Sequence, residues 1–205
     1  MCVIGTASYD AETGLPNLVE AAVNLARSMN FDYSCHPAQG RLLSLLAHGR
    51  PGGVIGETGT GCGVGLAWML SDADPSTHLV SIDKDPERSE AARRLFAPYD
   101  QVTVLTGDWR ELLVHGPFDL LVLDGGGSGK TLDDGRVQPQ EVLHPGGSLV
   151  IDDWTPWDMW PPSETGEFAH SRLHWLEHPD LLASEVRLLP TMSTIVAIRR
   201  DESER

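Results

Sequence analysis

Apolar and polar positions along the chain follow two alternating patterns. Helical spacing of apolar residues predicts helices over 15–29, 36–49, 63–73, 85–99 and 109–115, with a weaker pattern around 131–143. Short apolar runs between them predict strands over 53–57, 78–83, 101–108, 118–124 and 148–153. Because these runs are continuously apolar, we expect a parallel sheet that is buried on both faces.

The order of these elements predicts a doubly wound, Rossmann-like α/β fold with right-handed crossovers. Two further strands, at 183–190 and 193–200, are a few residues apart, which allows an antiparallel hairpin but no crossover. We therefore expect one domain with a seven-stranded, mostly parallel sheet and an antiparallel C-terminal edge hairpin. Its expected parts are N-terminal helices (1–49), a cofactor-binding core (50–153), a tryptophan-rich lid loop (154–170), and a C-terminal helix with the strand pair (171–205).

The first strand runs into a glycine-rich turn, Glu57-Thr58-Gly59-Thr60-Gly61-Cys62-Gly63. Glycines let the backbone turn sharply and approach a ligand closely. The dinucleotide fingerprint needs a third glycine where this chain has Val64. Glu57 would also repel a pyrophosphate and suits a cationic group. Five glycines within residues 56–65 favour a ligand-binding turn over an ordinary tight turn.

The next two strands also end in polar residues. Asp83 ends the second strand and can accept hydrogen bonds from ribose hydroxyls. Asp108 and Trp109 follow the third strand and suit the amino group and the face of an adenine. Asp108 could equally be the N-cap of the following helix. The three strand ends, taken in order, indicate a nucleoside-binding site.

These segments resemble the class I S-adenosylmethionine-dependent methyltransferases, most closely the small O-methyltransferases of the catechol and caffeoyl-coenzyme A type. The matching segments are "HPAQGRLLSLL", "VIGETGTGCG", "SIDKD", "TGDW", "FDLLVLD" and "LHPGGSLVIDD". The resemblance implies that S-adenosylmethionine is the cofactor. The residues that it implies for binding the cofactor are Glu57, Gly59, Gly61 and Gly63 for methionine and ribose, Asp83 for ribose, Asp108 and Trp109 for adenine, with Asp124 beside them.

Three carboxylates close the fourth and fifth predicted strands: Asp124, Asp152 and Asp153. If these strands are neighbours, the carboxylates converge beside the cofactor. Oxygen ligands of this kind suit Mg²⁺ or a similar divalent cation rather than zinc. The resembling family has Asn at the third position, where this chain has Asp153. The alternative is that the Asp152-Asp153 pair caps the next segment while Asp124 contacts cofactor or backbone.

The expected chemistry is methylation of a small phenolic or catechol-like acceptor, assisted by the metal, with Asp124 and Lys130 as candidate catalytic residues. The family usually places a lysine where this chain has Gly127, and Lys130 lies three residues further on. Lys130 could equally be a solvated loop lysine. His36 and His144 are further candidate bases. A metal-independent methyltransferase acting on nitrogen or carboxylate, and a cofactor-binding protein without transfer activity, stay open.

The segment 154–167, "WTPWDMWPPSETGE", shows no periodicity. Its aromatic residues Trp154, Trp157 and Trp160 could contact an aromatic acceptor or shield the site from water. They could equally cover the edge of the sheet. Irregular segments of this length are often functional, which favours substrate contact.

The stretch 121–131, "LVLDGGGSGKT", looks like a phosphate-binding loop. A true loop of that kind needs G-x-x-x-x-G-K-[ST], and this chain has Asp124 where the first glycine belongs. The stretch therefore departs from the pattern of a nucleotide-hydrolysing site, which is the further alternative. We interpret the stretch as a strand that carries a functional carboxylate, followed by a flexible glycine turn.

The amino-acid composition of the chain restricts the binding partners that we expect. The chain has 205 residues, with 15 Lys and Arg against 30 Asp and Glu, a net charge of −15. Such a chain would repel a polyphosphate, so we expect no nucleic acid partner. No apolar run has the length of a membrane span and no secretory signal is visible, so we expect a cytoplasmic protein without a membrane partner. The expected partner is a small-molecule acceptor, and a homodimer is compatible with the sequence.

Overall fold

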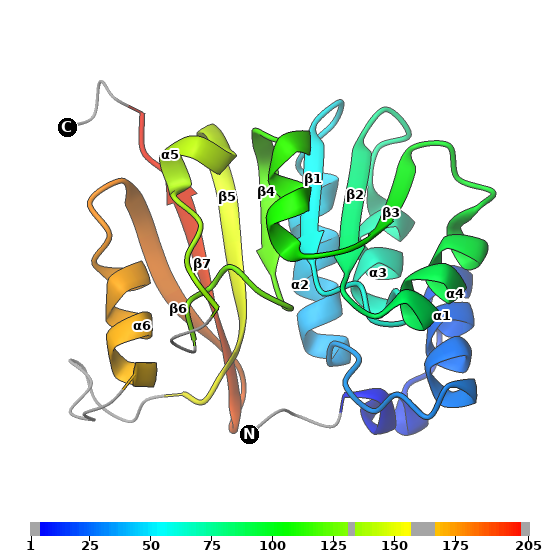
Figure 1. Ribbon diagram of the computed structural model, residues 1–205. Coiled ribbons are helices and arrows are strands. Elements are labelled where there is room, and N and C mark those ends of the chain that lie inside the picture. Colours follow the sequence, from blue (N-terminus) through cyan, green and yellow to red (C-terminus); the bar gives the residue numbers. More distant parts are fainter. Residues whose placement is uncertain (1–4, 131–133, 157–166, 202–205) are drawn as a thin grey trace.

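The computed structural model describes residues 5–130, 134–156 and 167–201. Among these residues, seven strands form one sheet in the order β3-β2-β1-β4-β5-β7-β6 (Figure 1). The strands are β1 (Val54–Thr58), β2 (His78–Asp83), β3 (Val102–Thr106), β4 (Phe118–Leu123), β5 (Leu143–Trp154), β6 (Leu181–Leu189) and β7 (Met192–Arg199).

The pairing of the strands confirms the predicted fold class. β1 pairs in parallel with β2 and with β4, while β2 pairs in parallel with β3 and β4 with β5. β7 is antiparallel to both β5 and β6, so the C-terminal hairpin forms one edge. β5 begins at Leu143, five residues before the predicted start at Ser148, and its register with β4 shifts between Phe118 and Leu120.

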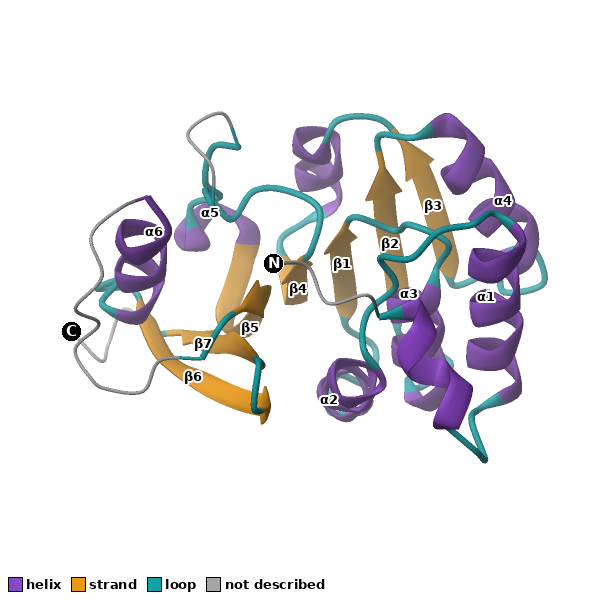
Figure 2. Cartoon of the chain, turned by 90° about the horizontal axis from the view of Figure 1, so that it is seen from below, coloured by secondary structure: helices purple, strands orange, loops and turns teal. Residues whose placement is uncertain are grey.

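Helices lie on both faces of the sheet (Figure 2). The α-helices are α1 (Asn17–Ser28), α2 (Pro37–His48), α3 (Val64–Asp72), α4 (Pro86–Phe96), α5 (Pro139–Val142) and α6 (Glu167–Leu176). Two 3₁₀ helices, η1 (Thr6–Ala11) and η2 (Trp109–His115), complete the described elements. η1 was not expected from the sequence. The helix expected around 131–143 is reduced to α5, because Gly135 takes a left-handed backbone conformation before Pro139.

Alternate residues of the central strands face two separate cores. One core packs Leu120 and Val122 of β4 against α1 to α4, and it includes Trp68 of α3 and Phe96 of α4. The other packs Leu121 and Leu123 against η2, α5 and α6. Central strands buried on both faces are what the continuously apolar runs predicted.

The two histidines considered as bases each lie near the start of a helix or strand. His36, a candidate base, is the N-cap of α2, where its Nδ1 atom accepts a hydrogen bond of 3.1 Å from the Ala38 N–H group. His144 lies at the amino end of β5, opposite to the end that carries Asp152. Both positions favour structural roles for these histidines. No helix in the described ranges is long and apolar enough to cross a membrane.

Candidate cofactor site

A cavity of about 240 Å³ opens at the carboxyl ends of the parallel strands. Each of the four strands β1 to β4 brings one acid to its wall, and these acids are Glu57, Asp83, Asp108 and Asp124. In an open α/β sheet this edge is where ligands bind. The structure therefore brings together the strand-end acids that the sequence singled out.

The glycine turn after β1 forms the floor of the cavity. Gly59 and Gly61 line the cavity and have φ angles of +92° and +53°. The Gly59 N–H group donates to the Ile82 carbonyl at 2.8 Å, which ties the turn to β2. Gly63 lies outside the cavity lining: it precedes α3 with φ +85°, and a side chain there would meet the Phe96 ring at 2.5 Å. A glycine at this position avoids that collision, and its predicted contact with the cofactor stays a prediction.

Glu57 is the most deeply buried of the four acids. Its side chain accepts a hydrogen bond of 2.6 Å from the Ser81 hydroxyl. Burial raises the pKa of Glu57 to about 8, against the smaller lowering effect of Ser81. A cation bound nearby would favour the ionised carboxylate, so this position suits a positively charged ligand group.

Asp83 is held by three donors around its carboxylate. The Gly61 N–H group donates at 2.7 Å, the Asp85 N–H group at 2.8 Å, and the Arg88 guanidinium at 3.0 Å. Arg88 also lines the cavity, as does Lys84. The sequence analysis missed both basic residues, although the spacing Asp83-x-Asp85-x-x-Arg88 across a helix start indicates an ion pair within the first turn.

Asp108 has both roles that the sequence left open. It is the N-cap of η2, with a capping box to Glu111, and it lines the cavity. Hydrogen bonding to the Arg110 N–H group lowers its pKa, so it is a carboxylate at neutral pH. The Trp109 side chain also lines the cavity. The Arg110 guanidinium lies 4.4 Å from the centre of its ring.

Two of the three carboxylates expected for a metal site, Asp124 and Asp152, can be placed. Asp124 is exposed at the end of β4, and Asp152 is buried in β5. The side chain of Asp153 lies outside what the structure describes. Within the described ranges, no group of three or more His, Cys, Asp or Glu side chains could hold a metal ion. The metal site therefore stays a prediction, because the side chain of its third expected ligand, Asp153, is not among the groups described.

Lys130 lies beside the end of β5. Its ammonium group donates to the Asp152 carbonyl and lies 5.1 Å from the centre of the Trp154 ring. Lys130 does not line the cavity. Asp152, whose carbonyl accepts its hydrogen bond, is close enough for its charge to act on Cys35, which does line the cavity. Burial, followed by the charges of Asp124 and Asp152, raises the pKa of the Cys35 thiol. The ammonium group therefore lies at the carboxyl end of β5.

The glycine turn before Lys130 already holds an anion of its own chain. The N–H groups of Gly127 and Gly129 donate to the Asp134 carboxylate at 2.9 and 2.8 Å. The Ser128 carbonyl accepts from Trp175 of α6 at 2.8 Å. Backbone donors that a phosphate would need are thus occupied, which argues against a phosphate loop. The expectation of a flexible turn was wrong, because both α6 and Asp134 fix it.

The three tryptophans expected to contact an acceptor have different outcomes. Trp154 is 2% exposed and belongs to β5 rather than to a lid, so it cannot touch an acceptor without rearrangement. Its ring also lies 5.0 Å from the Arg172 guanidinium. Trp157 and Trp160 lie outside the described residues, so their predicted role stays a prediction.

One wall of the cavity has no counterpart in the sequence analysis. It is the segment Phe31–Cys35 between α1 and α2, of which Phe31, Tyr33, Ser34 and Cys35 line the cavity. The Phe31 ring lies over the glycine turn, since a side chain at Gly61 would meet it at 2.9 Å. We call this segment the roof segment. The only signal for this wall in the sequence is the pair of aromatic residues Phe31 and Tyr33.

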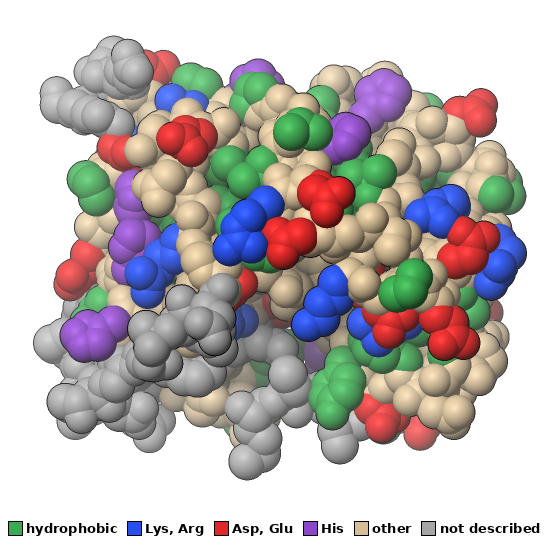
Figure 3. Space-filling view, in the orientation of Figure 1, with side chains coloured by type: hydrophobic (Ala, Val, Ile, Leu, Met, Phe, Trp, Pro, Cys, Tyr) green, Lys and Arg blue, Asp and Glu red, His purple; other side chains and the backbone are tan. Residues whose placement is uncertain are grey.

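The fold and the cavity define an α/β protein with an acid at the end of each of four parallel strands. Basic side chains on the face shown in Figure 3 are interspersed with acidic ones. The turn of glycines, the buried Glu57 and the paired Asp83 fit a nucleoside that carries a cationic group.

Comparisons with known proteins point to the same class. Residues 57–154 match the family model described as a methyltransferase domain. A protein of Mycobacterium sp. strain JLS, provisionally named an O-methyltransferase, is 32% identical over 128 residues, which cover 56% of this chain and 54% of that protein. The matching relative from Mycobacterium avium strain 104 is 33% identical over 122 residues, covering 56% of this chain and 54% of that protein. The chain thus matches about half the length of these curated relatives.

Solved structures confirm the fold over nearly the whole chain. The O-methyltransferase from Bacillus cereus, in complex with S-adenosylhomocysteine, superposes with a TM-score of 0.72 at 16% identity, covering 96% of this chain and 97% of that one. The O-methyltransferase TomG from Streptomyces achromogenes, in complex with S-adenosylmethionine, has a TM-score of 0.72 at 18% identity, with 97% and 96% covered. The chain therefore shares the fold of these methyltransferases, and residues 57–154 are similar to a methyltransferase domain.

Proposed function

We propose that the protein transfers the methyl group of S-adenosylmethionine to a hydroxyl oxygen of a small acceptor. The observation that carries this proposal is the set of four acids at the ends of β1 to β4 around one cavity. Glu57 would hold the cationic amino group, Asp83 the ribose, and Asp108 with Trp109 the adenine. Asp124 would lie on the side of the cavity that faces the acceptor.

Bound S-adenosylmethionine supplies an electrophilic methyl group, which an acceptor oxygen attacks in line while the carbon–sulfur bond breaks. The protein then has to orient the acceptor oxygen and stabilise its negative charge. Lys130 is suited to this task, because its ammonium has three N–H donors and one of them is used by the Asp152 carbonyl. A phenolic hydroxyl has an ordinary pKa near 10, and a positive charge beside it favours its ionised form. Phenolic and catechol-like acceptors are therefore the first to test.

Metal assistance, expected from the sequence, would require a divalent cation next to an ammonium group. Two neighbouring cations repel each other unless carboxylates separate them. We therefore propose that Lys130 provides the positive charge at this place. Turnover with a catechol should be unchanged after dialysis against EDTA. Restoration of lost turnover by Mg²⁺ would instead support a site completed by Asp153, and Asp124→Ala and Asp153→Ala would then each abolish the metal-dependent rate.

The experiment that tests the proposal as a whole is calorimetric titration with S-adenosylmethionine and S-adenosylhomocysteine, followed by a panel of phenols, catechols, amines and carboxylic acids. Binding followed by O-methylation supports it. Transfer to nitrogen or carboxylate would redirect it to another acceptor class. Binding without transfer to any acceptor would favour a cofactor-binding module. Cytoplasmic location and a homodimer remain predictions.

The raised pKa of Glu57 makes cofactor binding depend on pH. Glu57 is protonated in the empty site below its pKa of about 8, and it must ionise to pair with the amino group of the cofactor. Binding at pH 6.5 should therefore release close to one proton, and the affinity for S-adenosylhomocysteine should increase by about tenfold from pH 6.5 to pH 7.5. Titrations in buffers with different ionisation enthalpies measure the released proton directly.

The control for this prediction is Glu57→Gln, which cannot ionise. It should bind more weakly, with no proton release and with a flat affinity over the same pH interval. Proton release that persists in Glu57→Gln would assign the titration to another group. Without cofactor, the wild-type free energy of unfolding should decrease as pH rises from about 4.5 to about 8, because the folded Glu57 holds its proton over that window while the unfolded one has lost it.

A further inference from the structure

The roof segment Phe31–Cys35 has no helix or strand of its own to hold it in place. It nevertheless forms one wall of the cofactor cavity, with Phe31 over the glycine turn. The Arg88 guanidinium lies 5.1 Å from the centre of the Phe31 ring and adds a contact from α4. A wall of irregular backbone needs partners elsewhere for its peptide groups.

The partners come from η1 near the N-terminus. The Thr6 N–H group donates to the Asp32 carbonyl at 3.2 Å. The Thr6 hydroxyl donates to the Phe31 carbonyl at 2.7 Å and lies 2.8 Å from the Ser34 hydroxyl. Thr6 is buried, as is Ser34. Three of the five positions of the roof segment are thus bonded through one threonine.

Tyr9, one turn further along η1, holds the other end of the roof segment. Its hydroxyl donates to the Cys35 carbonyl at 3.0 Å and accepts from the Trp68 indole N–H at 2.8 Å. Both Tyr9 and Trp68 are buried. Trp68 belongs to α3, which begins directly after the glycine turn. The Tyr9 hydroxyl therefore connects the roof segment to the helix that follows the cavity floor.

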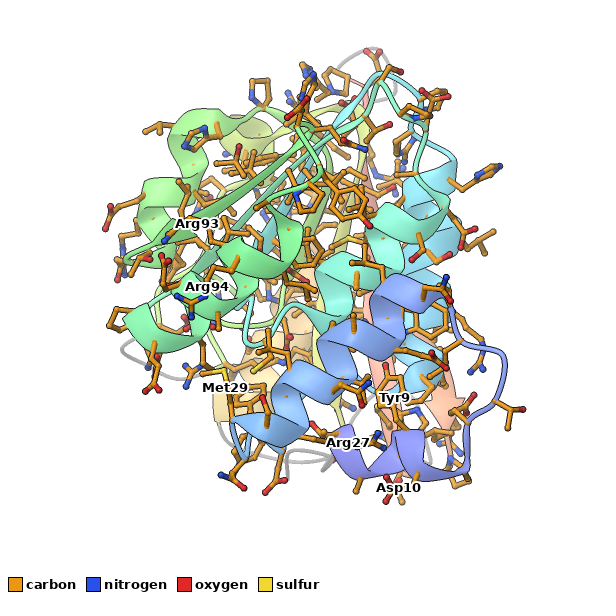
Figure 4. All side chains as sticks on the ribbon, turned by 90° about the vertical axis from the view of Figure 1, so that its right-hand side faces the viewer. Tyr9, Asp10, Arg27, Met29, Arg93 and Arg94 are labelled. Carbon is orange, nitrogen blue, oxygen red and sulfur yellow. The ribbon has the colours of Figure 1, made fainter. Side chains whose placement is uncertain are left out.

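Contacts at the surface complete the attachment of η1. Asp10 pairs with Arg27 of α1 at 2.6 Å, and Figure 4 shows η1 at one end of α1 with both residues on the outside. Exposed pairs of this kind contribute little to stability. The buried hydroxyls of Thr6 and Tyr9 are accordingly the contacts that matter for the roof segment.

We propose that η1 is a clamp for cofactor binding, in which Thr6 and Tyr9 are positioning residues that hold the roof segment over the cavity. The inference rests on the proposed function, since it assigns the cavity to S-adenosylmethionine. Its physical basis is pre-organisation: a wall ordered during folding does not have to be ordered at the expense of binding free energy. If η1 has this role, removal of its hydrogen bonds to the roof segment weakens cofactor binding and does not merely lower the stability of the protein.

The test uses substitutions that remove one hydroxyl and keep the shape of the side chain. Thr6→Val and Tyr9→Phe are compared with Thr77→Val, in which a buried threonine loses its 2.8 Å hydrogen bond to the Arg50 carbonyl. Thr77 precedes β2 and lies at the opposite end of the sheet from the cavity. Each variant is measured by thermal unfolding, by calorimetric titration with S-adenosylhomocysteine, and by hydrogen exchange of the peptide that contains residues 31–35.

Thr6→Val and Tyr9→Phe should each raise the Kd for S-adenosylhomocysteine about tenfold and speed exchange of the roof segment, because the segment is then ordered on binding. Thr77→Val should lower Tm with Kd and exchange unchanged. If Thr6→Val and Tyr9→Phe lower Tm but keep the wild-type Kd, η1 stabilises the fold alone and the clamp is refuted. Unchanged exchange in the roof segment refutes it as well, even without ligand. If the wild-type protein itself does not bind S-adenosylhomocysteine, the proposed function fails, and exchange still reports whether η1 holds the roof segment.

Discussion

Gly59→Ala is expected to abolish cofactor binding. A side chain at Gly59 would lie 2.6 Å from the backbone nitrogen of Gly125 and 2.7 Å from its Cα atom, and φ is +92°. The obstacle is backbone on the end of β4, which cannot rotate away as a side chain can. The Gly125 N–H group also donates to the Thr58 carbonyl at 2.7 Å, so separating the two turns breaks a bond between them. We expect a loss of more than about 3 kcal/mol in the free energy of unfolding and a Kd for S-adenosylhomocysteine more than about 100-fold higher.

Two other glycines separate the effect of backbone conformation from that of collision. Gly14 has φ +71° with nothing within 4 Å, so Gly14→Ala should cost about 1 kcal/mol, or about 2–4 °C in Tm, with unchanged affinity. Gly61 has φ +53° and faces the Phe31 side chain at 2.9 Å. Since that ring can shift, Gly61→Ala should weaken binding about tenfold. Chemical unfolding and calorimetric titration of the three variants give the order. A Gly59→Ala protein that binds within threefold of wild type would contradict this account.

The strand ends were predictable because they are local features of the sequence. A strand that ends in an acid, as β2 ends in Asp83, places that acid at the ligand-binding edge of any parallel sheet. Glu57 and Asp124 follow the same rule, and the order of strands in the fold then brings all of them to one cavity. The antiparallel hairpin was equally predictable, since its short connection excludes a crossover.

What the sequence could not supply depends on contacts between distant segments. Thr6 reaches the roof segment across 25 residues, and no periodicity announces such a contact. The glycine turn before Lys130 looked flexible from its composition. Its order comes from Asp134, a few residues on, and from Trp175, which is 47 residues away from Ser128. Composition predicts how freely a segment can move alone, but not which partners will hold it.

The same contacts decide how Lys130 should be interpreted. A lysine on a free loop would be solvated, and its removal would have little effect. Because Asp134 and α6 hold the turn, the ammonium group lies at the Asp152 carbonyl and near the Trp154 ring. Holding a charge in place before the reaction is how electrostatic catalysis gains its effect. From composition, Lys130 was as compatible with a solvated loop lysine as with a catalytic one. The ordered turn favours the catalytic role, because it holds the ammonium group in one place.

Lys130→Met is accordingly expected to lower kcat about 100-fold or more and to leave the Kd for S-adenosylhomocysteine within about twofold of wild type. The substitution removes the charge and keeps most of the chain length, so packing against Trp154 is retained. Steady-state kinetics with the best phenolic acceptor, together with calorimetric titration, separate the two effects. Lys130→Arg keeps the charge but cannot give up a proton, so substantial activity in that variant indicates charge stabilisation and its loss indicates a base.

The matched control is Lys84→Met, since Lys84 lines the cavity beside Asp83 at the end of β2. Removing that lysine should change cofactor affinity while kcat stays within about threefold of wild type, because the ribose end of the cavity is remote from the transferred methyl group. Equal losses of kcat in both variants would point to a general effect of net charge on the acidic cavity. Wild-type kcat in Lys130→Met would return Lys130 to the role of a structural lysine, and the acceptor oxygen would then need its positive partner from the part of the chain around Asp153.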